Sequence, residues 1–406
     1  MTDIKRIRLQ FPQLSEKVYG KDLVYLDNAA TALRPIPVLA KWGELSSRFN
    51  SNLHRAVHHT AEVATSEYES TRDCVKEFLN AKFREEIVFT SGATASLNLL
   101  AFCLGESIIS TGDEILVSEA EHHSNIVPWY MLCQRKGAVL KHFRVDDRGC
   151  IDLDDLSGKI TPRTKIVSFA HISNVLGIEN PVKEIVNICK SNNCISIIDG
   201  AQGIVHSSVD VTEFGCDFYC FSGHKIYAAP GTGVVYGRKE VLDTLPPYMG
   251  GGEMIASVSW DSITYAPIPG RFEAGTQNMA GVPTLKEALA IARTMKDIQD
   301  YSDQVRDYVL QELRDSRDVV LFGDPLDSSK KIPLFSFAVK GAHHEDLALI
   351  MDKMGIALRS GQMCAEPLMD RFGVTGMLRA SFAPYNTLEE ARYFIESLHK
   401  AVKMLK

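Results

Sequence analysis

The sequence lacks the features of a membrane protein or a nucleic-acid-binding protein. No stretch approaches the roughly 20 consecutive apolar residues that a transmembrane helix requires, and the N-terminal MTDIKRIRLQFPQLSEK has no long apolar run. We therefore expect neither a membrane partner nor a signal peptide. No block of basic residues is present, and the formal net charge is −7. This balance argues against nucleic acid and acidic membrane surfaces as partners.

Closely spaced cysteine pairs are missing as well. The nine cysteines are scattered over 406 residues without C-x-x-C spacing. An odd number of cysteines without a secretion signal is typical of reduced thiols in a cytoplasmic protein, and the spacing disfavours a disulfide framework or a zinc site. We expect no metal, a cytoplasmic location, and a buried position for most of these thiols.

What the sequence does contain is an alternation of strand-like and helix-like segments. Short apolar runs bounded by polar or glycine residues occupy 85–92, 113–118, 164–170, 194–199, 216–223 and 232–237. Near-continuous apolar runs are typical of strands buried on both faces of a sheet. Helix-like segments lie between several of them, for example 180–193, and residues 60–80 have apolar positions along one helical face. The alternation predicts an α/β fold with a mainly parallel sheet covered by helices.

The pattern changes after the last of these runs. A helix-like segment, 285–298, is followed by two strand candidates, 333–341 and 378–386. A final helix is predicted to begin at Thr387, because Glu390 stands three residues further on and completes a capping-box pattern. This region is predicted to form a second, smaller α+β domain.

An acid and an amine stand at the ends of two predicted strands. Asp199 ends the run 194–199, and Lys225 follows the run 216–223. The carboxyl ends of parallel strands form the edge at which open α/β sheets bind ligands. Taken alone, Asp199 is as well explained as a helix cap and Lys225 as a solvated lysine. Together they are the pair that pyridoxal phosphate chemistry needs, an amine for the aldehyde and a carboxylate for the pyridine nitrogen.

The segment TSGATASLN (90–98) combines a strand end, a glycine-containing turn and a helix start. Backbone N–H groups at a helix N-terminus bind phosphate, and Thr94 adds a hydroxyl. Ser222 and His224, beside Lys225, are candidates for further phosphate contacts. The motif alone is as often an ordinary turn between a strand and a helix.

Two further stretches contain candidate functional side chains. The adjacent histidines of AEHHSNIVPW (120–129) lack acidic or cysteine partners at metal spacing, which disfavours zinc. An imidazole stacked on an aromatic cofactor and a locally hydrogen-bonded neutral histidine are the remaining interpretations. Cys364 lies in the polar, glycine-containing LRSGQMCAEP (358–367), which favours an exposed reactive thiol over a core residue. Arg359 and Arg379 are candidates for bidentate binding of a substrate carboxylate, or else form surface ion pairs.

Six motifs, taken together, resemble those of one enzyme family. They are EHHSNIVPW (121–129), SNVLG (173–177), DGAQ (199–202), FSGHK (221–225), FEAGTQN (272–278) and RSGQMCAEP (359–367). In order and spacing they resemble the group II cysteine desulfurases of SufS/CsdA type, which are pyridoxal-phosphate enzymes of the class V aminotransferase family. The resemblance extends from VYLDNAATA (24–32) to SFAPYNT (381–387).

The resemblance implies the fold and the domains. It implies fold type I of the pyridoxal-phosphate-dependent transferases, with a seven-stranded, mainly parallel sheet in a large cofactor-binding domain at 27–285. A small α+β domain is implied at 286–406. The N-terminal segment 1–26 is expected to pack with the small domain.

The resemblance also implies a role for each matching residue. Lys225 looks like the Schiff-base lysine, Asp199 like the partner of the pyridine nitrogen and His123 like the catalytic imidazole stacked on the ring. Cys364 matches the nucleophile that takes the sulfur, and Arg379, with Arg359 nearby, matches the residue that binds the substrate carboxylate. Asn174 and Gln202 match residues near the phenolic oxygen of the cofactor, and Asn174 also faces the substrate. Thr94, Ser222 and His224 match residues at the phosphate, and Thr276 matches a threonine that reaches the phosphate of the neighbouring protomer. His54 and Arg55 match residues at the mouth of the site.

The implied reaction converts L-cysteine to L-alanine and leaves a persulfide on Cys364. The persulfide sulfur passes to an acceptor protein of SufE or SufU type for iron–sulfur cluster assembly. The resemblance also implies a homodimer and activity toward L-selenocysteine. The short segment from Arg359 to Cys364 predicts a fixed, recessed thiol.

Three positions depart from the family pattern. Ala95 stands where an acidic residue is usual, Ala228-Ala229 replace the residues that usually follow the lysine, and Gln362-Met363 replace two histidines before Cys364. Two other functions are therefore considered. One is another enzyme of the same fold, such as an aminotransferase, a kynureninase-like hydrolase or a selenocysteine-preferring lyase, which would not need Cys364. The other is a non-catalytic scaffold for iron–sulfur assembly, which the retained lysine, aspartate, histidine, arginine and cysteine argue against.

Overall fold

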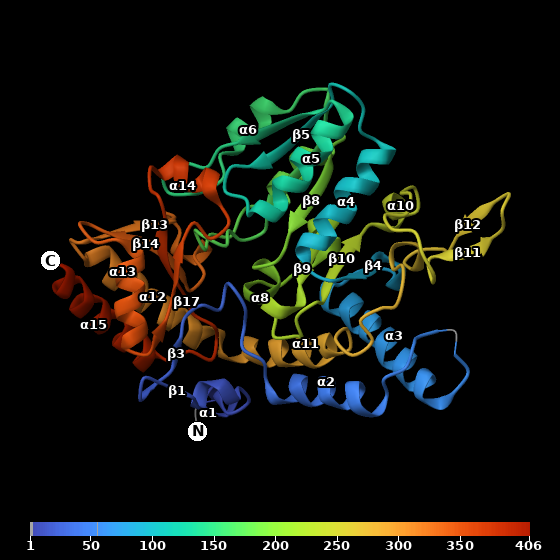
Figure 1. Cartoon of the computed structure of the whole chain (residues 1–406). Coiled ribbons are helices and arrows are strands. Elements are labelled where there is room, and N and C mark those ends of the chain that lie inside the picture. The colour runs from blue at the N-terminus through green and yellow to red at the C-terminus, as the bar shows by residue number, and fades with distance from the viewer. Residues whose placement is uncertain (1–2, 55) are drawn as a thin grey trace.

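The computed structural model describes residues 3–54 and 56–406. Its central sheet has seven strands in the order β4-β10-β9-β8-β7-β5-β6 (Figure 1). The strands are β4 Ile87–Thr90, β5 Glu114–Ser118, β6 Val139–Phe143, β7 Thr164–Ala170, β8 Ile195–Asp199, β9 Phe218–Ser222 and β10 Gly233–Gly237. Of these seven, β10 alone runs opposite to the other six, so its pairings with β4 and β9 are antiparallel. The predicted mainly parallel seven-stranded sheet is confirmed.

Six of the seven strands coincide with the apolar runs of the sequence. The exception is β6, an edge strand whose first four residues are exposed or half-buried. Its polar Lys141 and His142 face partly outward, so the segment has no continuous apolar run. β6 lies at one end of the sheet and pairs with β5 alone, and its exposed positions favour polar side chains.

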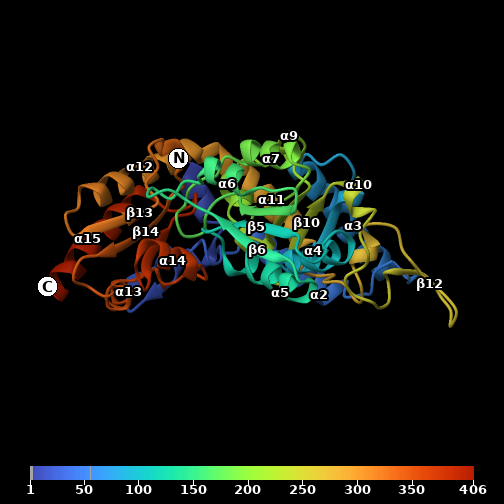
Figure 2. The same ribbon diagram turned by 90° about the horizontal axis from the view of Figure 1, so that it is seen from above.

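Fifteen α-helices occur in the described residues, and several of them cover the sheet on both faces (Figure 2). They are α1 Asp3–Arg8, α2 Ile36–Arg48, α3 His59–Leu79, α4 Ala93–Ser107, α5 Val127–Lys136, α6 Leu153–Lys159, α7 Val182–Ser191, α8 Gly203–His206, α9 Val211–Phe214, α10 Lys239–Leu242, α11 Thr284–Met295, α12 Gln299–Asp315, α13 His344–Lys353, α14 Glu366–Phe372 and α15 Leu388–Leu405. Successive strand residues point to opposite faces. Thus Val167 packs in the core that contains α7, and Ile166 packs in the core that contains α4 and α5.

A second sheet lies in the C-terminal part of the chain. Its order is β13-β14-β17-β16, with every pair antiparallel. The strands are β13 Val319–Phe322, β14 Leu334–Val339, β16 Arg359–Gly361 and β17 Met377–Ser381. Helices α12, α13 and α15 share one buried core with it. The predicted capping box is present, since Thr387 Oγ1 accepts from Glu390 N–H at 3.1 Å and Glu390 Oε2 accepts from Thr387 N–H at 2.9 Å.

The N-terminal segment contacts this C-terminal part. Strand β3 (Val24–Tyr25) pairs in parallel with β15 (Ile356–Ala357), and Arg8 forms an ion pair with Glu390 at 2.8 Å. The division of the chain at residues 26 and 285 stays a prediction.

The remaining strands are β1 Lys17–Val18, β2 Lys21–Asp22, and the hairpin of β11 Ile255–Val258 and β12 Ile263–Tyr265. This hairpin projects from the body of the molecule (Figure 1). Within the described residues, no helix is both long and apolar enough to cross a membrane.

Candidate active site

A cavity of about 300 Å³ lies at the carboxyl ends of the central strands. Asp199 is the last residue of β8, and Lys225 ends the short 3-10 turn that follows β9. Because β8 and β9 are parallel neighbours, both side chains reach the same edge and line the same cavity. The predicted site residues among its lining are Thr94, Asn174, Asp199, Ser222, His224, Lys225, Arg359, Cys364 and Arg379.

The acid and the amine influence each other. Burial lowers the pKa of Lys225, and the charges of Asp199 and Cys364 oppose that change. Burial raises the pKa of Asp199, and the charge of Lys225 opposes it. Asp199 Oδ1 also accepts the N–H of Ala201 at 2.9 Å, which fixes the carboxylate at the strand end. A lysine with a lowered pKa is suited to act as a nucleophile and a base near neutral pH.

The N-terminus of α4 forms another wall of the cavity. Gly92 precedes the helix with φ 152°, a conformation that residues with a Cβ rarely adopt. Ala93 N–H donates to Ser222 Oγ at 2.8 Å, and Thr94 Oγ1 is hydrogen-bonded to Ser124 Oγ at 2.7 Å. The N–H groups of the first turn have no partners within the helix, and the helix dipole favours an anion there. This wall is therefore suited to hold a phosphate group.

Arg379 is buried on the opposite side and has an unused donor. Its Nη1 donates to Asn174 O at 2.9 Å and its Nη2 to Asp27 Oδ1 at 3.3 Å, while its Nε has no hydrogen-bond partner among the described residues. Burial lowers the pKa of Arg379 to about 10, with Asp27 opposing. Arg359 also binds Asp27, at 2.7 Å from Nη2. Asp27 was not predicted, although it lies within the VYLDNAATA motif.

Cys364 lines the cavity from a constrained loop. Met363 and Cys364 both have left-handed backbones, with φ 50° and 55°, which is uncommon for residues other than glycine. Asn174 Nδ2 donates to Met363 O at 3.0 Å, and His123 N–H donates to Cys364 O at 2.7 Å. Of the nine cysteines, Cys364 alone is exposed. The expectation of a recessed thiol is therefore wrong, because Cys364 lines the cavity as an exposed residue.

His122, rather than His123, lines the cavity. Burial and the nearby charge of Lys225 lower the pKa of His122 to about 4, and its Nδ1 accepts the N–H of Ser124 at 3.0 Å. His123 instead holds the loop of Cys364, since its Nε2 accepts the N–H of Glu366 at 3.2 Å. The stacking role that the motif implies for His123 stays a prediction. Adjacent residues in a turn face different sides, and the HH motif alone does not tell them apart.

Other predicted residues lie outside the cavity lining. Gln202 is buried beneath it and donates to Ala29 O at 2.9 Å. Thr276 lines a separate cavity of about 310 Å³. His54 is exposed and hydrogen-bonded to Glu69 at 3.1 Å, which raises the pKa of the imidazole. Arg55 lies outside the described residues.

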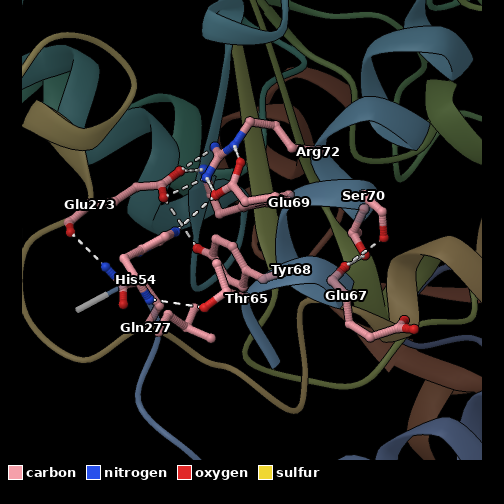
Figure 3. Close-up of polar contacts among 12 residues, drawn as sticks. His54, Thr65, Glu67, Tyr68, Glu69, Ser70, Arg72, Glu273 and Gln277 are labelled. Carbon is pink, nitrogen blue, oxygen red and sulfur yellow. Dashed lines mark hydrogen bonds and ion pairs between the residues drawn. The ribbon is translucent and has the colours of Figure 1, made fainter. Parts of the chain in front are cut away.

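Sequence reasoning missed the polar network beside Thr276 (Figure 3). The buried Glu273 carboxylate accepts from Arg72 Nη1 at 2.7 Å, Arg72 Nη2 at 2.9 Å and the N–H of Phe89 at 2.7 Å. Arg72 also donates to Glu69. Burial alone would raise the pKa of Glu69, but hydrogen bonds from His54 and Arg72 lower it to about 2. The network joins α3, β4 and the FEAGTQN motif, and only the motif was visible in the sequence.

The residues present fit pyridoxal phosphate. The cavity offers the Lys225 amine for an aldehyde, the buried Asp199 carboxylate for a pyridine nitrogen and the α4 N-terminus with Ser222 for a phosphate. Arg379 Nε is buried at this cavity without a hydrogen-bond partner among the described residues. No group of three or more histidine, cysteine or acidic side chains in the described part of the chain is arranged to hold a metal ion.

Comparison with known proteins defines the family. The model of the family "Aminotransferase class-V" matches residues 24–394. A protein of Vibrio cholerae named "Probable cysteine desulfurase" is 41% identical, with 100% of both chains covered, and a "Cysteine desulfurase" of Klebsiella pneumoniae is 40% identical, with 99% of both covered. The crystal structure of the cysteine desulfurase CsdA from Escherichia coli matches with a TM-score of 0.90 and 37% identity, again over 100% of both chains.

The fold and the cavity are those of a fold type I pyridoxal-phosphate enzyme, and the chain belongs to the class-V aminotransferase family. This family depends on pyridoxal phosphate. Within it, the chain belongs with the group II cysteine desulfurases of SufS/CsdA type, to which its full-length relatives correspond.

Proposed function

We propose that the protein transfers the sulfur of L-cysteine to Cys364 as a persulfide, releases L-alanine, and passes the sulfur to an acceptor protein. The observation that carries this proposal is the shared cavity of Lys225, Asp199, Arg379 and Cys364. Lys225, Asp199 and Arg379 suit pyridoxal-phosphate reactions of amino acids in general. An exposed thiol in the same cavity is needed only when sulfur is removed.

Substrate binding is assigned to the arginines. The unused Nε of Arg379 and the half-exposed guanidinium of Arg359 are suited to a carboxylate at the cavity wall. Arg379 is held by Asn174 O and Asp27, so it is already oriented before a substrate arrives. Such preorganisation lowers the entropy cost of binding.

The carbon chemistry is assigned to Lys225. Bound pyridoxal phosphate supplies an aldehyde and an electron-accepting ring that stabilises negative charge at the substrate Cα. Asp199 would hold the pyridine nitrogen, and Ser222, Thr94 and the α4 N-terminus would hold the phosphate. Lys225 Nζ removes the Cα proton, because its lowered pKa favours the neutral amine. We assign the imidazole that faces the ring to His122 instead of His123.

The sulfur step is assigned to Cys364. Its thiolate attacks the substrate Sγ, so that an S–S bond forms as the Cβ–Sγ bond breaks. The bonding electron pair stays with Cβ, which takes a proton and becomes the methyl group of L-alanine. One L-cysteine and one thiol thus give one L-alanine and one persulfide.

The remaining partners belong to the same proposal. The exposed position of Cys364 supports transfer of the persulfide sulfur to a SufE- or SufU-type acceptor for iron–sulfur cluster assembly in the cytoplasm. The position of Thr276 in a different cavity supports a homodimer in which it reaches the partner's phosphate. L-Selenocysteine is a second substrate, because selenide leaves carbon more easily than sulfide does.

The test measures L-alanine formed from L-cysteine by the purified holoenzyme with a reductant. Cys364→Ser should abolish alanine formation, and Cys150→Ser, a control at a half-buried thiol that is not part of the cavity lining, should leave it unchanged. An unimpaired Cys364→Ser variant would favour another reaction of the same fold. A wild-type protein that forms no alanine, with or without an acceptor, would favour the scaffold.

A further inference from the structure

Residues 174–177, which we call the carbonyl loop, are buried just after β7. Each of the four backbone carbonyls accepts a hydrogen bond from the C-terminal part of the chain. The bonds are Arg379 Nη1 to Asn174 O at 2.9 Å, Ser336 Oγ to Val175 O at 2.5 Å, Lys331 Nζ to Leu176 O at 2.5 Å and Ile332 N to Gly177 O at 2.9 Å. Four consecutive carbonyls are therefore bound from one side.

Three of the four amide groups of the carbonyl loop donate to Ser173, the residue directly before it. Ser173 Oγ accepts from Val175 N–H at 3.4 Å and from Leu176 N–H at 3.1 Å, and Ser173 O accepts from Gly177 N–H at 3.0 Å. Because these three amides have local partners, the shape of the loop is set locally. Its carbonyls are then available to the C-terminal part.

Two glycines permit this close contact. A Cβ on Gly177, which has φ 61°, would lie 2.7 Å from Leu334 O. A Cβ on Gly323, which has φ 73°, would lie 2.4 Å from Leu176 O. Both residues adopt the left-handed backbone that glycine tolerates. The chain is thus built for direct contact between these backbones.

Lys331 is the most unusual donor of the set. Lys331 is 1% exposed, and its Nζ donates to Gly323 O at 2.7 Å as well as to Leu176 O. Burial lowers the pKa of Lys331 to about 7, against the attraction of Asp324. A neutral amine keeps two N–H donors, so both carbonyls stay bonded in either charge state. Burying an amine is costly, which indicates that these two bonds matter to the structure.

The carbonyl loop meets the active site at its first residue. Asn174 lines the cavity, its carbonyl binds Arg379 and its side chain donates to Met363 O at 3.0 Å. Met363 directly precedes Cys364. A displacement of the loop would therefore move both the carboxylate-binding arginine and the thiol.

We propose that Lys331 and Ser336 are positioning residues for the reaction. By holding the carbonyl loop, they set the placement of Arg379 and Cys364 relative to Lys225. Neither residue lines the cavity. The roles of Arg379 and Cys364 rest on the proposed function, whereas the hydrogen bonds of Lys331 and Ser336 do not.

The test compares three holoenzyme variants with the wild type. Lys331→Met removes both hydrogen bonds while keeping the length of the side chain, Ser336→Ala removes one, and Lys330→Met changes an exposed neighbour as a control. The measurements are kcat and KM for L-cysteine, the dissociation constant of L-alanine by calorimetry, and cofactor content. Misplacement of about 1 Å lowers activity by roughly 10- to 100-fold.

We expect Lys331→Met to lower kcat/KM by roughly 10- to 100-fold. The same substitution should weaken L-alanine binding and leave the cofactor content unchanged. Ser336→Ala should show a smaller loss in the same direction, and Lys330→Met should stay within about twofold of the wild type. Ser336→Ala decides the question if Lys331→Met does not fold.

The proposal is overturned if Lys331→Met or Ser336→Ala loses thermal stability but keeps wild-type kcat/KM and L-alanine affinity, since that pattern belongs to a purely structural role. The L-alanine measurement separates this failure from failure of the proposed function. Loss of L-alanine affinity in Lys331→Met, combined with no alanine release from L-cysteine by the wild type, would refute desulfuration and still support positioning.

Discussion

Two adjacent histidines, His122 and His123, contact different parts of the active site. His122 lines the cavity with an imidazole whose pKa is lowered to about 4, so it is neutral at physiological pH. Its Nδ1 accepts the Ser124 N–H, which leaves Nε2 to carry the proton. His123 binds the backbone on both sides of Ala365. One histidine thus lines the cavity, and the other contacts the loop of the thiol.

Exchange of each histidine for asparagine tests this division. His122→Asn keeps an acceptor for Ser124 N–H but removes the ring, and kcat should fall by about 100-fold. His123→Asn should cost less than about tenfold, because the loop keeps its backbone hydrogen bond and its contact with Asn174. Steady-state kinetics and the cofactor absorbance of both variants show which histidine contributes more to the reaction. The opposite order of losses would restore His123 to the role that the motif implied.

At the scale of elements, a buried ion pair joins α3 to the FEAGTQN motif. The Arg72 and Glu273 side chains are 3% and 4% exposed, and every donor of Arg72 has an acceptor. Removing Glu273 leaves the buried Arg72 guanidinium with the less buried Glu69 as its remaining carboxylate partner. Removing one partner of a buried ion pair lowers the free energy of unfolding by far more than the intact pair adds to it.

Glu273→Gln should therefore lower the free energy of unfolding by about 3 kcal/mol. Denaturant titration of the holoenzyme measures the change. Arg84→Met, which breaks a 2.9 Å contact to Glu69 from a half-exposed position, is the matched control and should cost less than about 1 kcal/mol. Equal effects of the two substitutions would show that the buried pair is not an anchor.

The sequence predicts buried elements better than exposed ones. Strand β7 was found at its observed bounds because it is buried on both faces, whereas the polar edge strand β6 was missed. Ala228-Ala229, which replace the residues that usually follow the lysine, do not themselves need a left-handed backbone, since the left-handed positions of that turn fall on Tyr227 and Gly231. Such details depend on tertiary contacts.

The candidate site was predictable in its chemistry but not in its fine placement. Lys225 and Asp199 follow apolar runs whose ends share one edge of a parallel sheet, so their meeting followed from topology. The carbonyl loop has no comparable signal, because its donors act on backbone carbonyls that are the same in every residue. Glu273 likewise looked like any surface glutamate until the structure placed Arg72 beside it.

At the scale of the whole molecule, the cavity lies where the two sheets meet. Asp199 ends β8 of the central sheet, Lys225 follows β9 of that sheet, and Arg379 belongs to β17 of the second sheet. Both parts must be folded and joined for the site to exist. Conditions that loosen the junction should therefore affect stability and activity together. His206 lies in a junction cavity of about 220 Å³, beside Lys331.

Acid should weaken this junction through His206. Burial lowers its pKa to about 4, against the attraction of Glu179, whereas an unfolded histidine has a pKa near 6.5. Between these values the unfolded chain binds a proton that the folded chain does not, so this contribution to stability is present above about pH 6.5 and is lost as the pH falls toward 4. Glu121, with its pKa raised to about 8 by burial, has the opposite pH dependence.

Comparison with His206→Gln isolates that contribution. Denaturant midpoints measured from pH 7.5 to 4.5 should fall more steeply for the wild type than for the variant. Parallel curves across this range would mean that His206 titrates alike in the folded and unfolded states.

The central claim is that Cys364 accepts the substrate sulfur, and mass spectrometry of the Cys364 peptide tests it most directly. The holoenzyme is treated with L-cysteine in the absence of reductant and acceptor, and its persulfides are trapped by alkylation. The account predicts that one additional sulfur atom appears on Cys364, that Cys74 and Cys150 stay unmodified, and that Lys225→Ala gives no signal. A Cys364 peptide without added sulfur, from an enzyme that still releases L-alanine, would contradict the account.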